Sequence, residues 1–464
     1  MRDTPPAAAP APESLAARLR RHVPDLLRLA WPVMLSRAGI LLMAFTDIAM
    51  LGRYGPGAVG EANLGLSVFV PVLVLTIGLS SGVAPVAAHA FGRGDWAECG
   101  QAWRRALVWG FVISVVGTWA VWQGDWVLGV LGQTPEFAAK GGAVAQALAP
   151  GLLAQTAFAV CAFYLEATRR PMAGLVVMLA ANLANFGLNW LLIYGNAGFP
   201  EMGAVGAALA STIVRFAAAF AMIGLILAQR DARAAGVTGP WETFWGPGGW
   251  RAGYLMRKLG LSAGLSNGFE TVGFATMSLF AAGLGPLALD AYSISHNLVS
   301  TVFMIGLGLA VATGVRVGIE TGRGRPDEAA FAGWTGLGVA LATMGTLGAL
   351  VILGRHQIAA VYTDDPDIIA RASGLFLFSA VVFIPDAAQV VMGQAVRALG
   401  DAWIAILAYI LAFTVILIPL GWWMIHPGGW DESGLLVAIF LCCTLAVGLL
   451  GWRFRVLTRG ARAP

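Results

Sequence analysis

Three acidic residues lie well inside stretches of the chain that are otherwise apolar: Asp47, Glu270 and Asp386. A carboxylate near the centre of a bilayer costs about 2.5–3.5 kcal/mol on insertion scales, so an acid in such a stretch normally serves a function. A buried carboxylate can take up a proton, and it can bind a hard cation, because such cations prefer oxygen ligands. The sequence therefore predicts that these three residues bind a cation or a proton.

Glu270 has polar neighbours at helical spacing. Asn267 and Thr271 share one face of a predicted helix with it. We expect that face to contact a substrate or a cation. The alternative is a structural ion pair between Glu270 and a nearby arginine.

Asp386 directly follows a proline. Pro385 has no backbone N–H, so the carbonyl of Val381 loses its usual helical partner. A freed carbonyl beside a carboxylate suits Na⁺, and we predict a site for that ion at Glu270 and Asp386. Gln389 lies on the same helical stripe and is a further predicted contact. The alternative is a proline kink at which Asp386 is hydrogen-bonded locally.

Asp47 belongs to a second predicted site. Asn185 and Asn189 lie one helical turn apart in another apolar stretch and are predicted to contact substrate or cation. The alternatives are a buried pair between Asp47 and another helix, and hydrogen bonds from the asparagines that only join helices.

The remaining reactive residue types do not form a catalytic pattern. The four cysteines lack the spacing of a metal or disulfide framework, and His89 and His296 are read as hydrogen-bonded interior residues. No HExxH or P-loop motif occurs. We expect no enzyme, no resident metal and no cofactor, with Na⁺ or H⁺ only as a coupling ion.

The composition indicates which elements hold these residues. Of the 464 residues, 58% are hydrophobic and only 12% are charged, against about 25% charged in soluble domains. An apolar stretch of about 20 residues spans a bilayer as a helix. Twelve such stretches are predicted: 28–51, 63–90, 104–123, 140–165, 172–194, 203–228, 254–283, 291–320, 330–354, 368–397, 402–425 and 434–457. The fold class is an all-α polytopic membrane protein.

The chain divides into two halves with short flanking segments. The predicted parts are a tail at 1–27, six spans at 28–228, a linker at 229–253, six spans at 254–457 and a tail at 458–464. The linker contains Gly239-Pro240 and Gly246-Pro247-Gly248-Gly249. The first 25 or so residues are rich in Pro, Ala and Arg, lack the features of a signal peptide, and are expected to be disordered.

Basic residues predict the orientation. With the N-terminus inside, 22 of the 29 Lys and Arg residues fall on the cytoplasmic side and four outside. Cytoplasmic loops carry an excess of Lys and Arg, so both termini are predicted to be cytoplasmic. Because the basic residues lie between apolar stretches, we expect a lipid bilayer and no nucleic acid as partner, and a monomer without an obligate protein partner.

The two halves repeat. A shift of about 230 residues aligns Gly55-Pro56 with Gly285-Pro286, Gly78-Leu79 with Gly308-Leu309, and GRG at 92–94 with GRG at 322–324. Six spans per repeat give both halves the same orientation, as in transporters whose substrate path lies between two bundles. Under the shift, Asp47, Glu270 and Asp386 each align with a residue that is not acidic. This asymmetry favours function over packing.

Several stretches are similar to one transporter family. TDIAMLGRYG, AHAFGRGDW and NFGLNWLLIYGNAGFPEMGAVGAALAS in the first half, and AYSISHNLVSTVFMIGLGLAVATGVRVGIETGRG and DAAQVVMGQAVRALGD in the second, resemble the multidrug and toxic compound extrusion (MATE) family, in its NorM-like branch. The resemblance implies export of bulky, often cationic compounds across a bacterial inner membrane by alternating access, driven by Na⁺ or H⁺.

Four positions depart from the family pattern. Ser262 replaces a common proline, His89 a common glutamine, Ala398 a common glycine, and Phe383 a residue that is often polar. The change at Phe383 leaves Na⁺ and H⁺ both open.

Other classes of function remain. A flippase for a lipid-linked precursor shares the architecture, but it should line its cavity with several basic residues. Here Arg37, Arg215 and Arg316 lie within spans, against three acids. Two repeated bundles argue against a channel, and the missing catalytic groups argue against a membrane-embedded enzyme.

Overall fold

The computed structural model describes residues 14–229, 232–234, 236–238 and 249–460, and every regular element within these ranges is a helix. The first half contains α1 (Leu15–Tyr54), α2 (Ala58–Ser80), α3 (Val83–Arg93), α4 (Trp96–Trp122), α5 (Gly124–Val130), α6 (Pro135–Leu148), α7 (Gly151–Ala167), α8 (Met172–Leu192), the short η1 (Asn196–Gly198) and α9 (Gly203–Leu227). The second half contains α10 (Gly249–Ala252), α11 (Tyr254–Gly283), α12 (Pro286–Gly322), α13 (Pro326–Tyr362), α14 (Pro366–Ala398), α15 (Trp403–Tyr409), the π-helical η3 (Ile410–Ile416), α16 (Leu417–Ile425) and α17 (Ser433–Gly460). The predicted linker motifs at 239–248 lie outside the described residues.

The helices match the predicted all-α membrane fold. Ten helical segments are long and apolar enough to cross a bilayer, and α6 with α7, bent by 42°, forms an eleventh. The remaining predicted span is α11, whose 30 residues include Ser, Asn, Glu and Thr, which lower its hydropathy. The count of twelve therefore stays a prediction that depends on α11.

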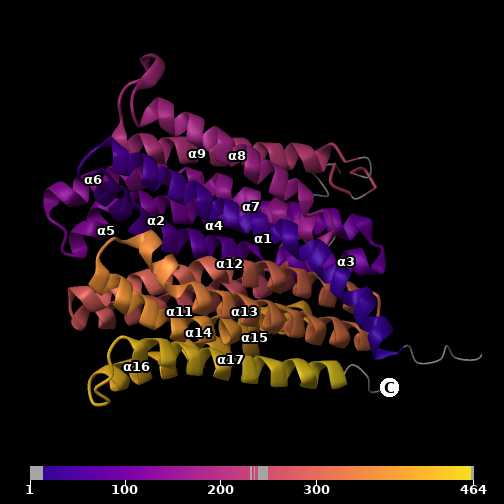
Figure 1. The fold of residues 1–464 in the computed structure, drawn as a ribbon. Coiled ribbons are helices and arrows are strands. Elements are labelled where there is room, and N and C mark those ends of the chain that lie inside the picture. Colours follow the sequence, from indigo (N-terminus) through magenta and orange to yellow (C-terminus); the bar gives the residue numbers. More distant parts are fainter. Residues whose placement is uncertain (1–13, 230–231, 235, 239–248, 461–464) are drawn as a thin grey trace, which may run out of the picture.

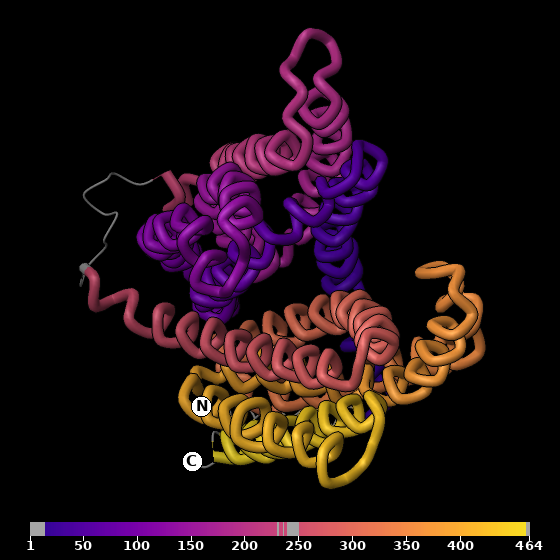
Figure 2. The backbone as a smooth tube through the Cα atoms, turned by 90° about the vertical axis from the view of Figure 1, so that its left-hand side faces the viewer, coloured from indigo at the N-terminus to yellow at the C-terminus, as the bar shows by residue number. Residues whose placement is uncertain are grey.

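The two halves of the sequence form two lobes. In Figure 1 the first-half helices, from indigo to magenta, lie above the second-half helices, from salmon to yellow, and Figure 2 shows the same separation from another side. We call them the N-lobe (residues 15–227) and the C-lobe (residues 249–460). One large cluster of buried apolar residues lies mainly in the C-lobe and two lie mainly in the N-lobe, but the larger N-lobe cluster also includes Met256, Val311, Val315 and Ile319 of the C-lobe.

α1 begins earlier than predicted, and the expectation of disorder up to about residue 25 is wrong for residues 15–25. The side chain of Ser14 caps the helix by accepting from the backbone N–H of Ala17 at 3.3 Å, which satisfies one of the free donors of the first turn. Leu26, Leu29 and Ala30 are buried in the core of the C-lobe. The first turns of α1 therefore belong to the packing of the other lobe.

The lobes meet at one end of the bundle, which we call the basic end: the end with the two GRG turns, on the right in Figure 1. α2 packs on α11 there, and α1 and α3 pack on α12. Gly82 and Gly260 sit so close to the opposite lobe that a Cβ on either would collide with a backbone carbonyl, of Met256 and of Leu79 respectively. Glycine at these positions lets the two backbones touch.

Candidate functional site

Glu270 and Gln389 meet in the C-lobe. Gln389, on α14, donates from Nε2 to Oε1 of Glu270, on α11, at 2.8 Å, and both side chains are buried. Asp386, one turn before Gln389 on the same helix, is also buried. The Sγ of Cys443, on α17, lies 3.9 Å from Oδ1 of Asp386. The structure thus places Gln389, predicted from the Asp386 stripe, in contact with Glu270 of the predicted site.

The two acids of this site lack a cationic partner. Within the described residues, no Arg, Lys or His nitrogen lies within 4.0 Å of the carboxylate of Glu270 or Asp386. The predicted alternative for Glu270, an ion pair with an arginine, is therefore absent from this part of the chain. Arg397 completes the predicted stripe on α14 and is buried; it interacts electrostatically with Glu270 from beyond 4.0 Å.

Several polar atoms of the same region are buried and have no hydrogen-bond partner among the residues that the structure describes. They are Oε1 of Gln389, Oγ of Ser266, and Nε and Nη1 of Arg397. Ser266 is fully buried and lies one turn before Glu270 on α11, and sequence reasoning missed it. Two carboxylates with unpaired amide and hydroxyl oxygens fit a hard cation. They also fit a proton with water, since unpaired buried polar groups are costly.

Thr271 and Asn267 do not join this site through a side-chain contact. Thr271 is exposed, and its hydroxyl donates to the backbone carbonyl of Asn267 at 2.8 Å. Asn267 is half-buried. Their predicted roles in binding stay predictions.

Asp47 is held by a closed set of hydrogen bonds in the N-lobe. Asn189, on α8, donates to Oδ1 of Asp47 at 2.6 Å, and Ser211, on α9, donates to Oδ2 at 2.7 Å. Asn189 also donates to Asn185 at 3.2 Å, and Asn185 donates to Ser211 at 3.2 Å. The predicted trio is thus one network. Ser211, which sequence reasoning missed, completes it.

Among the intramembrane arginines, Arg37 is ion-paired, whereas Arg215 lies against an aromatic ring and its buried Nη1 has no hydrogen bond to the described residues. Arg37 donates to Glu166 of α7 at 3.2 Å, and both side chains are buried. Glu166 was not predicted, because it stands at the end of a span, where a capping role is ordinary. The guanidinium of Arg215 lies over the ring of Phe69 at 4.8 Å.

Three of the four positions that depart from the family pattern are structural contacts. Nε2 of His89 lies 2.6 Å from the carbonyl oxygen of Ala398, joining α3 of the N-lobe to the end of α14 in the C-lobe. Ser262 donates to the carbonyl of Ala402 at 2.8 Å. His89 is therefore hydrogen-bonded, as predicted, and it connects the two lobes at the basic end.

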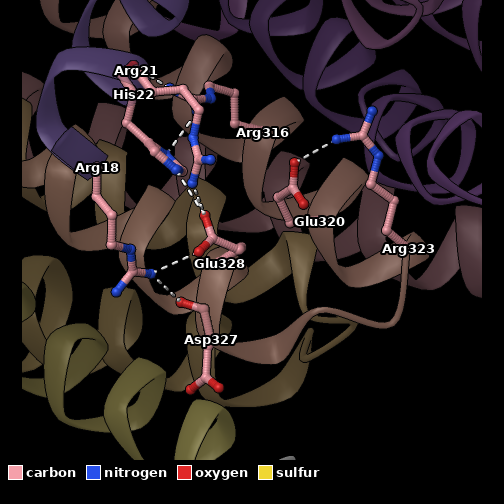
Figure 3. Close-up of polar contacts among 8 residues, drawn as sticks. All are labelled: Arg18, Arg21, His22, Arg316, Glu320, Arg323, Asp327 and Glu328. Carbon is pink, nitrogen blue, oxygen red and sulfur yellow. Dashed lines mark hydrogen bonds and ion pairs between the residues drawn. The ribbon is translucent and has the colours of Figure 1, made fainter. Parts of the chain in front are cut away.

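A polar cluster at the basic end joins α1 to the C-lobe (Figure 3). Arg316 donates to the backbone carbonyl of His22 and, at 2.7 Å, to Nδ1 of the same residue. A guanidinium only donates, so Nδ1 is the acceptor and Nε2 carries the proton. Nε2 lies 2.8 Å from Oε2 of Glu328, whose Oε1 accepts from Arg18 at 2.9 Å. Arg21 lies 3.3 Å from Oε2. We call these five residues the clasp.

Comparison with known proteins gives matches over nearly the whole chain. The model of the family described as MatE matches residues 32–191 and again residues 263–423. "Probable multidrug resistance protein NorM" of Caulobacter vibrioides is 34% identical over 96% of this chain and 94% of its own. "Multidrug resistance protein PmpM" of Pseudomonas aeruginosa is 31% identical over 94% of this chain and 93% of its own.

Solved structures share the fold. A structure described as the "outward-facing conformation of a multidrug resistance MATE family transporter of the MOP superfamily" has a TM-score of 0.86 at 17% identity. The match covers 98% of this chain and 100% of the chain in that structure. The "crystal structure of eukaryotic MATE transporter AtDTX14" has a TM-score of 0.82 at 18% identity, with 96% of this chain and 99% of that one covered. At these identities the likeness is one of fold.

Proposed function

The chain belongs to the MatE family, in its NorM-like branch, and from this premise we propose that it is a cation-coupled multidrug antiporter. It is a multi-pass membrane transport protein of a family whose relatives are named multidrug resistance proteins. Its substrates are bulky, often cationic and aromatic organic compounds, and the driving force is the inward flow of Na⁺ or H⁺.

One observation carries the coupling: Glu270 and Asp386 are buried together without a cationic partner within the described residues. Paired buried charges are expected, and unpaired ones are costly. Na⁺ or H⁺ would neutralise these carboxylates, and so would an organic cation close to them. Binding of the coupling ion then removes the charge that attracts the substrate and favours its release.

The contacts between the lobes at the basic end support alternating access. The contacts of α2 with α11 and of α1 and α3 with α12 close the bundle at that end. With the basic end in the cytoplasm of a bacterial cell, as the distribution of Lys and Arg predicts, this is a state closed to the cytoplasm. Loading from inside requires the lobes to separate at the glycine contacts, the His89 contact and the clasp.

The flippase alternative is disfavoured by the arginines. Arg37 is paired with Glu166, Arg316 is bound to His22, and Arg215 lies against Phe69. A pyrophosphate group would need free basic side chains facing it. We therefore retain drug export, by a monomer in the inner membrane.

The proposal is tested by ethidium efflux from proteoliposomes under an imposed Na⁺ or H⁺ gradient. We expect gradient-driven efflux from the wild type and none from Asp386→Asn. Asp290→Asn is the matched control, because Asp290 is an exposed carboxylate of the same lobe. Coupled efflux that survives Asp386→Asn would exclude the coupling site, and no wild-type efflux under either gradient would overturn the exporter. The gradient that works identifies the ion.

A further inference from the structure

A cavity of about 560 Å³ opens at the basic end, outside the sites described above. It is lined by Asp25, Arg28, Leu29 and Trp31 of α1 and by Arg169, Arg170, Pro171 and Met172 between α7 and α8. We propose that this cavity binds the phosphate headgroup of an anionic phospholipid from the adjoining leaflet. The inference does not depend on the coupling ion or on the exported substrate.

The charges in the cavity favour an anion. Three arginines face one carboxylate, that of Asp25, which lies 2.8 Å from Nη2 of Arg169. Arg28 is exposed and has no hydrogen bond or ion pair to any residue that the structure describes. Its planar guanidinium, with five N–H donors, suits a phosphate and can bind it through two parallel hydrogen bonds.

The backbone that presents Arg169 is strained. Arg169 has φ +63°, in the left-handed region, and its N–H bonds the carbonyl of Glu166 at 3.1 Å. Non-glycine residues rarely adopt this conformation, and when they do they are concentrated at functional sites. The turn lets Arg169 reach Asp25 while Arg170 donates to Gln229 at 2.6 Å. Both arginines line the cavity as a result.

The apolar surface next to the cavity favours a lipid over a soluble phosphate as the ligand. α1 and α8 pack side by side, and each carries a stripe of exposed apolar residues leading away from the arginines. The stripes consist of Leu27, Trp31 and Leu35 on α1 and of Met172, Val176 and Leu179 on α8. Tryptophan favours the boundary between headgroups and acyl chains. An acyl chain along these stripes would continue from a headgroup among the arginines, whereas free phosphate would leave them unused.

The test measures binding of phosphatidylglycerol to the purified full-length protein in detergent, by native mass spectrometry. We expect the wild type to retain phosphatidylglycerol in preference to phosphatidylcholine. A basic residue near a membrane surface contributes a factor of about 5 to binding, so Arg28→Gln should weaken retention about fivefold. Because Arg28 has no partner within the described residues, this variant should fold normally, and its melting temperature without added lipid verifies that.

Arg325→Gln is the matched control. Arg325 is exposed at the same end of the bundle but belongs to the C-lobe, away from the cavity. If Arg28→Gln and Arg325→Gln lose phosphatidylglycerol equally, the effect comes from general surface charge and the proposal is overturned. Equal retention of phosphatidylglycerol and phosphatidylcholine by the wild type would also overturn it. Glycerol phosphate is the soluble probe. If it displaces the lipid at equal concentration, the site binds free phosphate and the assignment to lipid is wrong.

Discussion

The two lobes hold their acids in opposite ways. Asp47 in the N-lobe is half-buried and accepts one hydrogen bond on each oxygen, from Asn189 and Ser211. Glu270 in the C-lobe is buried more deeply and has an amide partner on one oxygen, while Asp386 has a weak thiol contact. Both lobes belong to one repeated fold, so the fold alone does not account for the difference.

The difference separates an acid that is already satisfied from two that are not. Hydrogen bonds to a charged group contribute about 1.5–3 kcal/mol each, so the N-lobe network offsets part of the cost of burying an ionised Asp47. The C-lobe site gains most when a cation or proton arrives. Under the proposed function we therefore propose a division between the lobes, in which the C-lobe acids bind the coupling ion and Asp47 supplies a negative charge in the N-lobe.

The largest expected effect comes from Glu270→Gln. Replacing this carboxylate by an isosteric amide removes a charged ligand worth about 3 kcal/mol, or about 100-fold in affinity for the coupling ion. The measurement is the ion concentration that gives half-maximal efflux in proteoliposomes, with Asp290→Asn as control. A change below about threefold would contradict the assignment of ion binding to the C-lobe.

Ser211→Ala tests whether the N-lobe network is structural. Removing one donor to Asp47 should lower the free energy of unfolding by about 1–2 kcal/mol and leave ion affinity unchanged. The melting temperature in detergent should fall by a few degrees, more than for Ser67→Ala, whose hydroxyl bonds only its own helix. If Ser211→Ala instead shifts the ion concentration for half-maximal efflux, the division between the lobes fails.

Glu328→Gln tests the clasp that joins the two lobes. Losing the negative charge weakens contacts with His22, Arg18 and Arg21, and partly exposed pairs contribute about 1 kcal/mol. Amide hydrogen exchange over residues 15–27 should rise about fivefold. Arg323→Gln, which breaks a pair with Glu320 within the C-lobe, should leave that exchange unchanged, and an equal rise in both variants would exclude the clasp as its cause.

Asp47→Asn should have the smallest effect on ion affinity. An asparagine can still accept from Asn189 and can donate to the hydroxyl of Ser211, so the network persists. We expect a change of about threefold or less in the ion concentration for half-maximal efflux, because the field of a distant charge is weak. A loss as large as that of Glu270→Gln would place Asp47 in the ion site.

The sequence was enough to find the acids and the amide side chains that contact them, Asn189 and Gln389, but not the buried serines nearby. Asp47, Glu270 and Asp386 are conspicuous because a charged residue inside an apolar stretch can be recognised from the sequence alone. Ser211 and Ser266 are small residues of a type common in membrane helices. The role of Ser211 follows only from the packing of α1, α8 and α9, and that of Ser266 only from its position one turn before Glu270 on α11. The repeat in sequence was a better guide to the fold, and the same family model matches both halves.

Residues 15–25 of α1 were wrongly predicted to be disordered, because their helix depends on contacts with distant parts of the chain. Their Arg-rich and Pro-containing sequence is typical of a disordered tail, and their helix is stabilised by partners far along the chain. His22 and Glu328 are separated by 306 residues. No local sequence pattern predicts a contact across so many residues, so the prediction failed at a segment whose helix is stabilised by tertiary packing.

The clasp also has a consequence for the order in which the protein is made. Arg18, Arg21 and His22 leave the ribosome long before their carboxylate partner, Glu328. At about 5–20 residues per second, the interval is about 15–60 s. Throughout that time the first turns of the chain lack the acid that holds them, while the N-lobe helices are already entering the membrane. Closure of the basic end can then be completed only after α13 has emerged, so Arg18, Arg21 and His22 reach their native contacts long after they are made.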